Sequence, residues 1–300
     1  MRIDVAFDAD GTTLRGWLYT PDEGAEPFPI IVMAHGFSAL KEMGLDQYAE
    51  VFASAGLAAL VYDNRNLGAS EGKPRFEIDP IAQMRDYRHA ITYAQTRPEV
   101  HPDRIGIWGT SYSGGLVLMV AALDRRVKCV VSQVPFISGY ETMVQVMPLD
   151  ERKQFYDRLQ KERLSLAAGN PPSLVAVCTN DTSKPNDAPG RRTYSYFQSF
   201  TQQNKLNWEN KVTIRSLDLR LEYEAMPFVP RISPTPLMMI VADTDTITPT
   251  DIALSAFERA HEPKKIVLLQ GDHYVPYIEA FDHSSGAARD WFVQHLFRDT

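Results

Sequence analysis

A serine between a short apolar run and a glycine-rich segment is the feature that most constrains this chain. Residues 104–108 predict a buried strand that leads into Gly109, and Ser111 follows two positions later. The small residues after Ser111 are compatible with a helix over 112–123. Strand, sharp turn and helix in this order are typical of a nucleophile elbow, in which the turn holds one hydroxyl above a sheet. We therefore interpret Ser111 as a nucleophile.

Small residues flank this serine two positions away on each side. Bulk at Gly109 or at position 113 would clash where the strand folds back into the helix. The strict pattern has glycine at both positions, whereas this chain has Ser113, which is small enough for the turn. A glycine-rich anion-binding loop is the alternative, but no Gly-x-x-x-x-Gly-Lys pattern follows, which disfavours it.

Buried strands and amphipathic helices alternate on both sides of the elbow. We expect strands at 2–8, 12–19, 27–34, 57–62, 104–108, 127–134, 236–242 and 265–269, and helices at 44–55, 78–97, 112–123, 249–260 and 276–297. The first two strands predict an antiparallel hairpin, and Pro98 and Pro102 predict a break before the elbow strand. The alternation predicts an α/β fold with a mostly parallel central sheet and helices on both faces.

The alternation is lost over residues 138–233. This stretch contains a charged helical segment at 150–168, a Pro/Asn/Asp-rich loop at 180–190 and a group of aromatic residues, Tyr194, Tyr196, Phe197, Phe200 and Trp208. We expect a core domain formed by 1–137 and 234–300, with 138–233 inserted as a cap. The aromatic residues either contact a bulky apolar acyl group or form the packed interior of the cap.

Composition excludes several functional classes. The 300 residues are 44% hydrophobic and 23% charged, which suits one large packed domain, and the net charge of −7 without a basic block argues against nucleic-acid binding. Cys129 and Cys178 lie far apart in the sequence and form no spacing typical of a disulfide framework or a zinc site. We therefore expect no disulfide, no metal site and no cofactor. Without an apolar leader or a run of about 18 apolar residues, a cytoplasmic protein without a membrane partner is expected. The oligomeric state stays open, with a homodimer as one alternative.

A serine nucleophile on such a fold needs an acid and then a histidine later in the chain. The strand at 236–242 is followed by Asp243 and Asp245, and a carboxylate past the end of a parallel strand points into the catalytic crevice. We favour Asp245, which lies in the loop four residues before Pro249, and interpret Asp243 as a turn residue. Asp251 fits the first turn of the next helix.

Two histidines directly follow predicted strands, His35 and His273. His273 comes after the last strand and is the expected base, with Asp245 orienting its imidazole. His35 precedes the serine, which is the wrong order, so we interpret it as a residue that braces its loop. We expect the remaining histidines in helices or helix ends at the surface: His89, His101, His261, His283 and His295.

The oxyanion hole needs the backbone N–H after the nucleophile and a second one from the loop after the strand at 27–34. These positions are Tyr112 and Phe37. Gly36 allows the backbone to come close to the substrate.

Together these segments resemble the α/β-hydrolase superfamily, and more closely the dienelactone-hydrolase-like branch that includes fungal polyketide transferases and their bacterial relatives. The resemblance is carried by residues 35–37, 63–70, 108–115, 132–135, Asp245 and 271–273. The Ser111-Tyr112 pair also resembles X-prolyl peptidases and cocaine esterase. Asn66 and Ser113 depart from the superfamily pattern without removing a catalytic group. The resemblance implies acyl chemistry, either hydrolysis of esters and thioesters or acyl transfer to an alcohol.

The leading hypothesis is a serine acyl hydrolase, an esterase or thioesterase that forms an acyl-enzyme on Ser111 and takes a small-molecule acyl substrate. The alternative is an acyltransferase, in which an alcohol replaces water at the second step. A C–C bond or lyase reaction on the same triad and a catalytically silent binding protein are lower alternatives. A peptidase is disfavoured because no charged anchor for a peptide terminus is evident.

Overall fold

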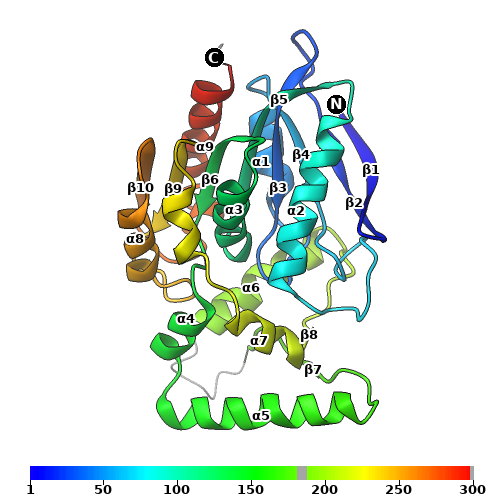
Figure 1. Ribbon diagram of the computed structural model, residues 1–300, viewed down its shortest axis with the longest axis vertical. Coiled ribbons are helices and arrows are strands. Elements are labelled where there is room, and N and C mark those ends of the chain that lie inside the picture. Colours follow the sequence, from blue (N-terminus) through cyan, green and yellow to red (C-terminus); the bar gives the residue numbers. More distant parts are fainter. Residues whose placement is uncertain (181–187, 298–300) are drawn as a thin grey trace.

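An eight-stranded sheet forms the centre of the molecule (Figure 1), and the computed structural model describes residues 1–180 and 188–297. Residues 181–187 of the loop expected at 180–190 lie outside the described residues. The strand order is β1-β2-β4-β3-β5-β6-β9-β10. β1 and β2 pair antiparallel, as do β2 and β4, and every other neighbouring pair is parallel. The mostly parallel sheet predicted from the sequence is therefore confirmed.

The strands follow the apolar runs of the sequence. Their bounds are β1 (Arg2–Ala9), β2 (Thr12–Tyr19), β3 (Phe28–Ala34), β4 (Ala58–Tyr62), β5 (Val100–Thr110), β6 (Val127–Gln133), β9 (Leu237–Ala242) and β10 (Lys264–Leu269). All seven residues of β3 are buried, because helices cover both faces of the sheet. Ile30 and Val32 face one apolar core, and Ile31 and Met33 face the other.

Helices cover the two faces of the sheet. The first face carries α2 (Pro80–Gln95), α3 (Tyr112–Leu123) and α8 (Thr250–Arg259), and the second carries α1 (Leu45–Ala53) and α9 (Phe281–Leu296). The start of α2 shows how a single residue of the local sequence sets where a helix begins. Asp79 accepts hydrogen bonds from the backbone N–H groups of Ile81 and Ala82, which satisfies donors that a helix start leaves free.

Two element boundaries differ from the sequence prediction. β5 begins at Val100 and contains His101 and Pro102, so Pro102 does not break the strand, and the expectation of His101 at a helix end was wrong. The pairing of β5 with β3 is irregular here, and a residue without an N–H is tolerated where the ladder is interrupted. The C-terminal helix begins at Phe281, not near 276, because a 3₁₀ turn, η2 (Val275–Tyr277), precedes it. The carbonyl oxygen of Pro276 accepts hydrogen bonds from the hydroxyls of Tyr48 and Ser284.

The stretch from 138 to 233 contributes helices and short strands beyond one end of the sheet, opposite the end where both chain termini lie (Figure 1). β6 and β9 are neighbours in the sheet although this stretch separates them in sequence. Its elements are α4 (Gly139–Val146), α5 (Leu149–Ala167), β7 (Leu174–Val175), α6 (Ala188–Gln203), β8 (Val212–Thr213), α7 (Ile214–Leu221) and η1 (Met226–Arg231). The charged segment expected at 150–168 is helix α5.

Candidate active site

The strand-to-helix turn between β5 and α3 holds Ser111 in a strained conformation. Its φ of 55° and ψ of −120° lie in a region that side chains rarely adopt, at a cost of about 1–3 kcal/mol. A Cβ atom added to Gly109 would stand 2.2 Å from the carbonyl oxygen of Ser113, so this position requires glycine. The local geometry is that of a nucleophile elbow.

Ser113 makes a defined contact where the strict elbow pattern has glycine. Its side chain is fully buried, and its hydroxyl donates a hydrogen bond to the carbonyl oxygen of His35 at 2.5 Å. His35 is fully buried, and its Nε2 accepts a hydrogen bond from the backbone N–H of Asn64 at 3.0 Å. Burial lowers the pKa of the His35 imidazole, which favours the neutral form that this bond requires. Ser113 and His35 thus connect α3, the loop after β3 and the loop after β4.

The structure brings Ser111, His273 and Asp245 into one hydrogen-bonded row. The Nε2 atom of His273 lies 3.0 Å from the Ser111 hydroxyl oxygen, and its Nδ1 lies 2.6 Å from Oδ2 of Asp245. The three residues follow the carboxyl ends of β5, β9 and β10, where side chains of neighbouring parallel strands meet. The histidine can therefore accept the serine proton while the carboxylate holds its other ring nitrogen.

Asp245 is buried, but its surroundings favour the ionised form of its carboxyl group. Burial acts to raise the pKa of its carboxyl, yet His273 and hydrogen bonds from Thr248 outweigh burial and hold that pKa below its usual value. Oδ1 accepts from the backbone N–H groups of Ile247 and Thr248, at 2.8 and 2.9 Å. The Thr248 hydroxyl lies 2.7 Å from Oδ2. The carboxylate is therefore held ionised and in a fixed direction.

The competing acidic residues lie elsewhere. Asp243 is exposed and accepts a hydrogen bond from the backbone N–H of Gly271 at 2.9 Å, which is a turn contact. Asp251 lies in the first turn of α8 and contacts Gln145 at 3.1 Å. Thr248, which the sequence analysis missed, contacts both Asp245 and His273. Its position three residues after an aspartate in a loop is a signal for such a side-chain turn.

The predicted oxyanion donors border the same space as Ser111. Tyr112 is the first residue of α3, where a backbone N–H has no acceptor within the helix and carries the positive end of the helix dipole. A Cβ added to Gly36 would stand 3.1 Å from Cβ of Ser111, so the backbone next to Phe37 passes close to Ser111. Among the described residues the N–H of Phe37 has no hydrogen-bond partner. These two amides are suitably placed for the predicted role, which stays a prediction.

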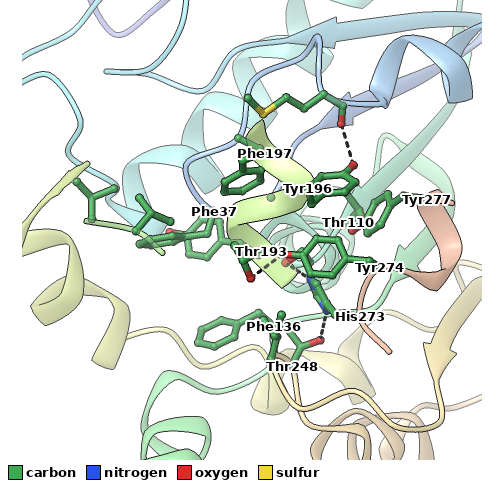
Figure 2. A pocket seen from close by; sticks show the side chains of 18 of the residues that line it. Phe37, Thr110, Phe136, Thr193, Tyr196, Phe197, Thr248, His273, Tyr274 and Tyr277 are labelled. Carbon is green, nitrogen blue, oxygen red and sulfur yellow. Dashed lines mark hydrogen bonds between the residues drawn. The ribbon is translucent and has the colours of Figure 1, made fainter. Parts of the chain in front are cut away.

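A cavity of about 200 Å³ opens in front of the serine. Figure 2 shows its aromatic lining: Phe37, Phe136, Tyr196, Phe197, Tyr274 and Tyr277, together with His273 and three threonines. Tyr196 and Phe197 come from α6 and also pack internally, since the Tyr196 and Tyr274 rings lie 4.7 Å apart and those of Phe197 and Trp208 lie 5.0 Å apart. Tyr196 and Phe197 therefore both line the cavity and pack against other aromatic rings, and their contact with an acyl group stays a prediction.

Substitution of Gly36 by alanine is expected to lower kcat/KM for an acyl ester by about ten- to a hundredfold, because the added methyl group forces the loop away from Ser111 and displaces the Phe37 amide. Steady-state kinetics measure the loss. Gly286→Ala is the matched control, since a Cβ there meets only the end of the Arg289 side chain, at 3.8 Å. Equal activity of the two variants would contradict a role for this loop.

The fold and the site define a serine hydrolase of the α/β-hydrolase class. Residues 10–275 match the family described as X-Pro dipeptidyl-peptidase (S15 family), and the chain belongs to that family. It is similar to a "Thiohydrolase" of Eupenicillium brefeldianum, with 32% identity over 286 residues, 94% of this chain and 90% of the relative. It is also 30% identical to "Polyketide transferase grgF" of a Penicillium species, over 92% of this chain and 90% of the relative.

A solved structure supports the same assignment. The α/β hydrolase GrgF from Penicillium sp. sh18 superposes with a TM-score of 0.84 at 29% identity, and the match covers 99% of both chains. The resemblance to the α/β hydrolases and polyketide transferases inferred from the sequence motifs is therefore confirmed. Within the described part of the chain, no helix combines the length and apolarity needed to cross a membrane.

Proposed function

We propose that this chain hydrolyses small-molecule acyl thioesters or esters through an acyl-enzyme on Ser111. The observation that carries the proposal is the row of two hydrogen bonds, 3.0 Å from His273 to Ser111 and 2.6 Å from His273 to Asp245. The relative named as a thiohydrolase supports a thioester substrate.

The reaction follows from this geometry. The Ser111 oxygen attacks the acyl carbonyl carbon as its proton passes to Nε2 of His273, and the backbone N–H groups of Phe37 and Tyr112 stabilise the oxyanion. The tetrahedral intermediate collapses, the bond to the leaving sulfur or oxygen breaks, and the imidazolium returns the proton to that atom. Water, deprotonated by His273, then attacks the ester on Ser111. As the acid leaves, the imidazolium returns this proton to the Ser111 oxygen.

Acyl transfer is the second candidate, because the last step accepts an alcohol in place of water. The aromatic side chains of Tyr196, Phe197 and Tyr277 favour it, since an apolar cavity excludes water in favour of an organic acceptor. The relative named as a polyketide transferase supports the same alternative.

Residues 138–233 act in this proposal as the cap that selects the substrate, and 1–137 with 234–300 act as the core that carries the reacting groups. The pocket supports this division: Val177, Thr193, Phe197 and Leu217 of the cap line the cavity in front of Ser111. We place the enzyme in the cytoplasm, with a small-molecule substrate and neither nucleic acid nor membrane as a partner.

A fluorophosphonate, which phosphonylates activated serines with loss of fluoride, tests the nucleophile. The expected result is one adduct, located on Ser111 by peptide mass analysis, and protection by a slowly turned-over ester. An adduct on another residue, or none, would contradict the proposal. Product analysis of thioester turnover with added primary alcohols then separates free acid from new ester, and so separates hydrolysis from acyl transfer.

A further inference from the structure

Arg220 brings a positive charge into the cavity that contains Ser111 and His273. It lies in the last turn of α7, a helix of the proposed cap. The described residues that line this cavity include no aspartate and no glutamate. The cavity therefore holds a guanidinium group without an opposite charge.

One nitrogen of the guanidinium lacks a hydrogen-bond acceptor among the described residues. Its buried Nε atom has no partner within 1–180 and 188–297, and the same part of the chain forms no ion pair with Arg220. A second arginine of the same helix behaves differently: Arg215 pairs with Glu77 at 3.1 Å. A buried donor without an acceptor destabilises a protein by about 1–3 kcal/mol, so a side chain left in this state points to a missing ligand.

Two aromatic rings of the cavity lining contact the guanidinium of Arg220. Its guanidinium carbon lies 5.8 Å from the ring centre of Phe37 and 5.9 Å from that of Phe136. Such contacts stabilise the positive charge but accept none of the N–H hydrogen bonds. Burial lowers the pKa of Arg220, but a guanidinium group stays protonated in proteins at neutral pH.

We propose that Arg220 binds a carboxylate carried by the substrate and so selects acyl thioesters or esters with an anionic second group. The planar fork of a guanidinium matches the two oxygens of a carboxylate, and a carboxylate adds little volume to a cavity of about 200 Å³ that also holds the acyl group. The contact with Phe37 places this charge near the predicted oxyanion hole. The inference rests on the proposed function of Ser111.

Two matched substrate pairs test the proposal. In the first, the carboxylate is on the acyl group: the mono-4-nitrophenyl ester of adipic acid is compared with the corresponding ester of adipic acid monoamide. In the second, it is on the leaving group: 4-carboxyphenyl hexanoate is compared with 4-carbamoylphenyl hexanoate. The wild-type enzyme is expected to prefer the carboxylate in one pair by about ten- to a hundredfold in kcat/KM. The preferred pair identifies which part of the substrate Arg220 binds.

Variants locate the preference at Arg220. Arg220→Met is expected to bring the ratio of the two kcat/KM values close to one, and Arg220→Lys to retain part of it, because the charge remains but the planar fork is lost. Arg163→Met is the matched control, since it removes the same charge from an exposed site on α5, where Arg163 pairs with Asp218. This control is expected to keep the wild-type ratio.

The proposal is overturned if wild type prefers the carboxylate in neither pair, or if Arg220→Met keeps the preference. The wild-type comparison and Arg220→Lys decide the question even if Arg220→Met does not fold, which circular dichroism shows. Failure of the proposed function looks different: neither the charged nor the neutral ester is turned over, and the fluorophosphonate does not label Ser111.

Discussion

Replacement of Ser111 by alanine is expected to reduce kcat for an acyl thioester on the order of 10⁶-fold, the size of loss seen when the nucleophile of a serine triad is removed. The residual rate comes from the oxyanion donors and from substrate binding, which the substitution leaves in place. KM is expected to change far less, because the hydroxyl reacts with the substrate but contributes little to holding it. Steady-state kinetics with a chromogenic thioester measure both constants.

Ser54→Ala is the matched control for this loss. It makes the same atomic change at an exposed serine after α1, where the hydroxyl donates to the carbonyl oxygen of Glu50. We expect wild-type kinetics from this variant. Turnover by Ser111→Ala within tenfold of wild type would show that another group attacks the substrate.

Substitution of Asp245 by asparagine is expected to lower kcat by about 10⁴-fold, because an amide in this position favours the wrong tautomer of His273. The carboxylate accepts from Nδ1 of His273 at 2.6 Å, and it is ionised because His273 and the hydrogen bonds of Thr248 outweigh burial and lower its pKa. The folded pKa lies below the unperturbed 3.8, so the stabilisation by this carboxylate is complete above pH 3.8 and is lost as the pH falls through the folded pKa. An acid limb of activity near neutral pH therefore does not originate in Asp245.

Asp243→Asn separates the two carboxylates that compete for this role. The substitution is chemically identical and lies two residues away, where Asp243 contacts the backbone of Gly271 and not His273. We expect its kcat to stay close to that of wild type. A larger loss in Asp243→Asn than in Asp245→Asn would assign the acid to Asp243.

The strands and the elbow of this core could be predicted because their signals lie in short stretches of the sequence. Apolar runs of five to eight residues identified the buried strands, and the small residues around Ser111 identified the turn, since bulk at Gly109 would strike the backbone of Ser113. The predicted element boundaries were wrong where contacts between residues far apart in the sequence override the local structural preference. Pro102 lies inside β5 because an irregular pairing with β3 tolerates it, and side-chain hydrogen bonds to Pro276 accompany the later start of the C-terminal helix.

The order of the chemistry-bearing residues along the chain is a property of the sequence, and it pointed to Ser111, Asp245 and His273 because each lies in the segment after a predicted strand. The position of Asp245 before Pro249 favoured it over Asp243. The distances between Ser111, Asp245 and His273 are a property of the tertiary structure, since the pairing of β6 with β9 across the 138–233 stretch is what brings the ends of β5, β9 and β10 together. The hydrogen bond from Ser113 to His35 joins residues 78 positions apart. Arg220 has no local signal at all: only folding places its charge beside Phe37 and Phe136, in the lining of the cavity that contains Ser111.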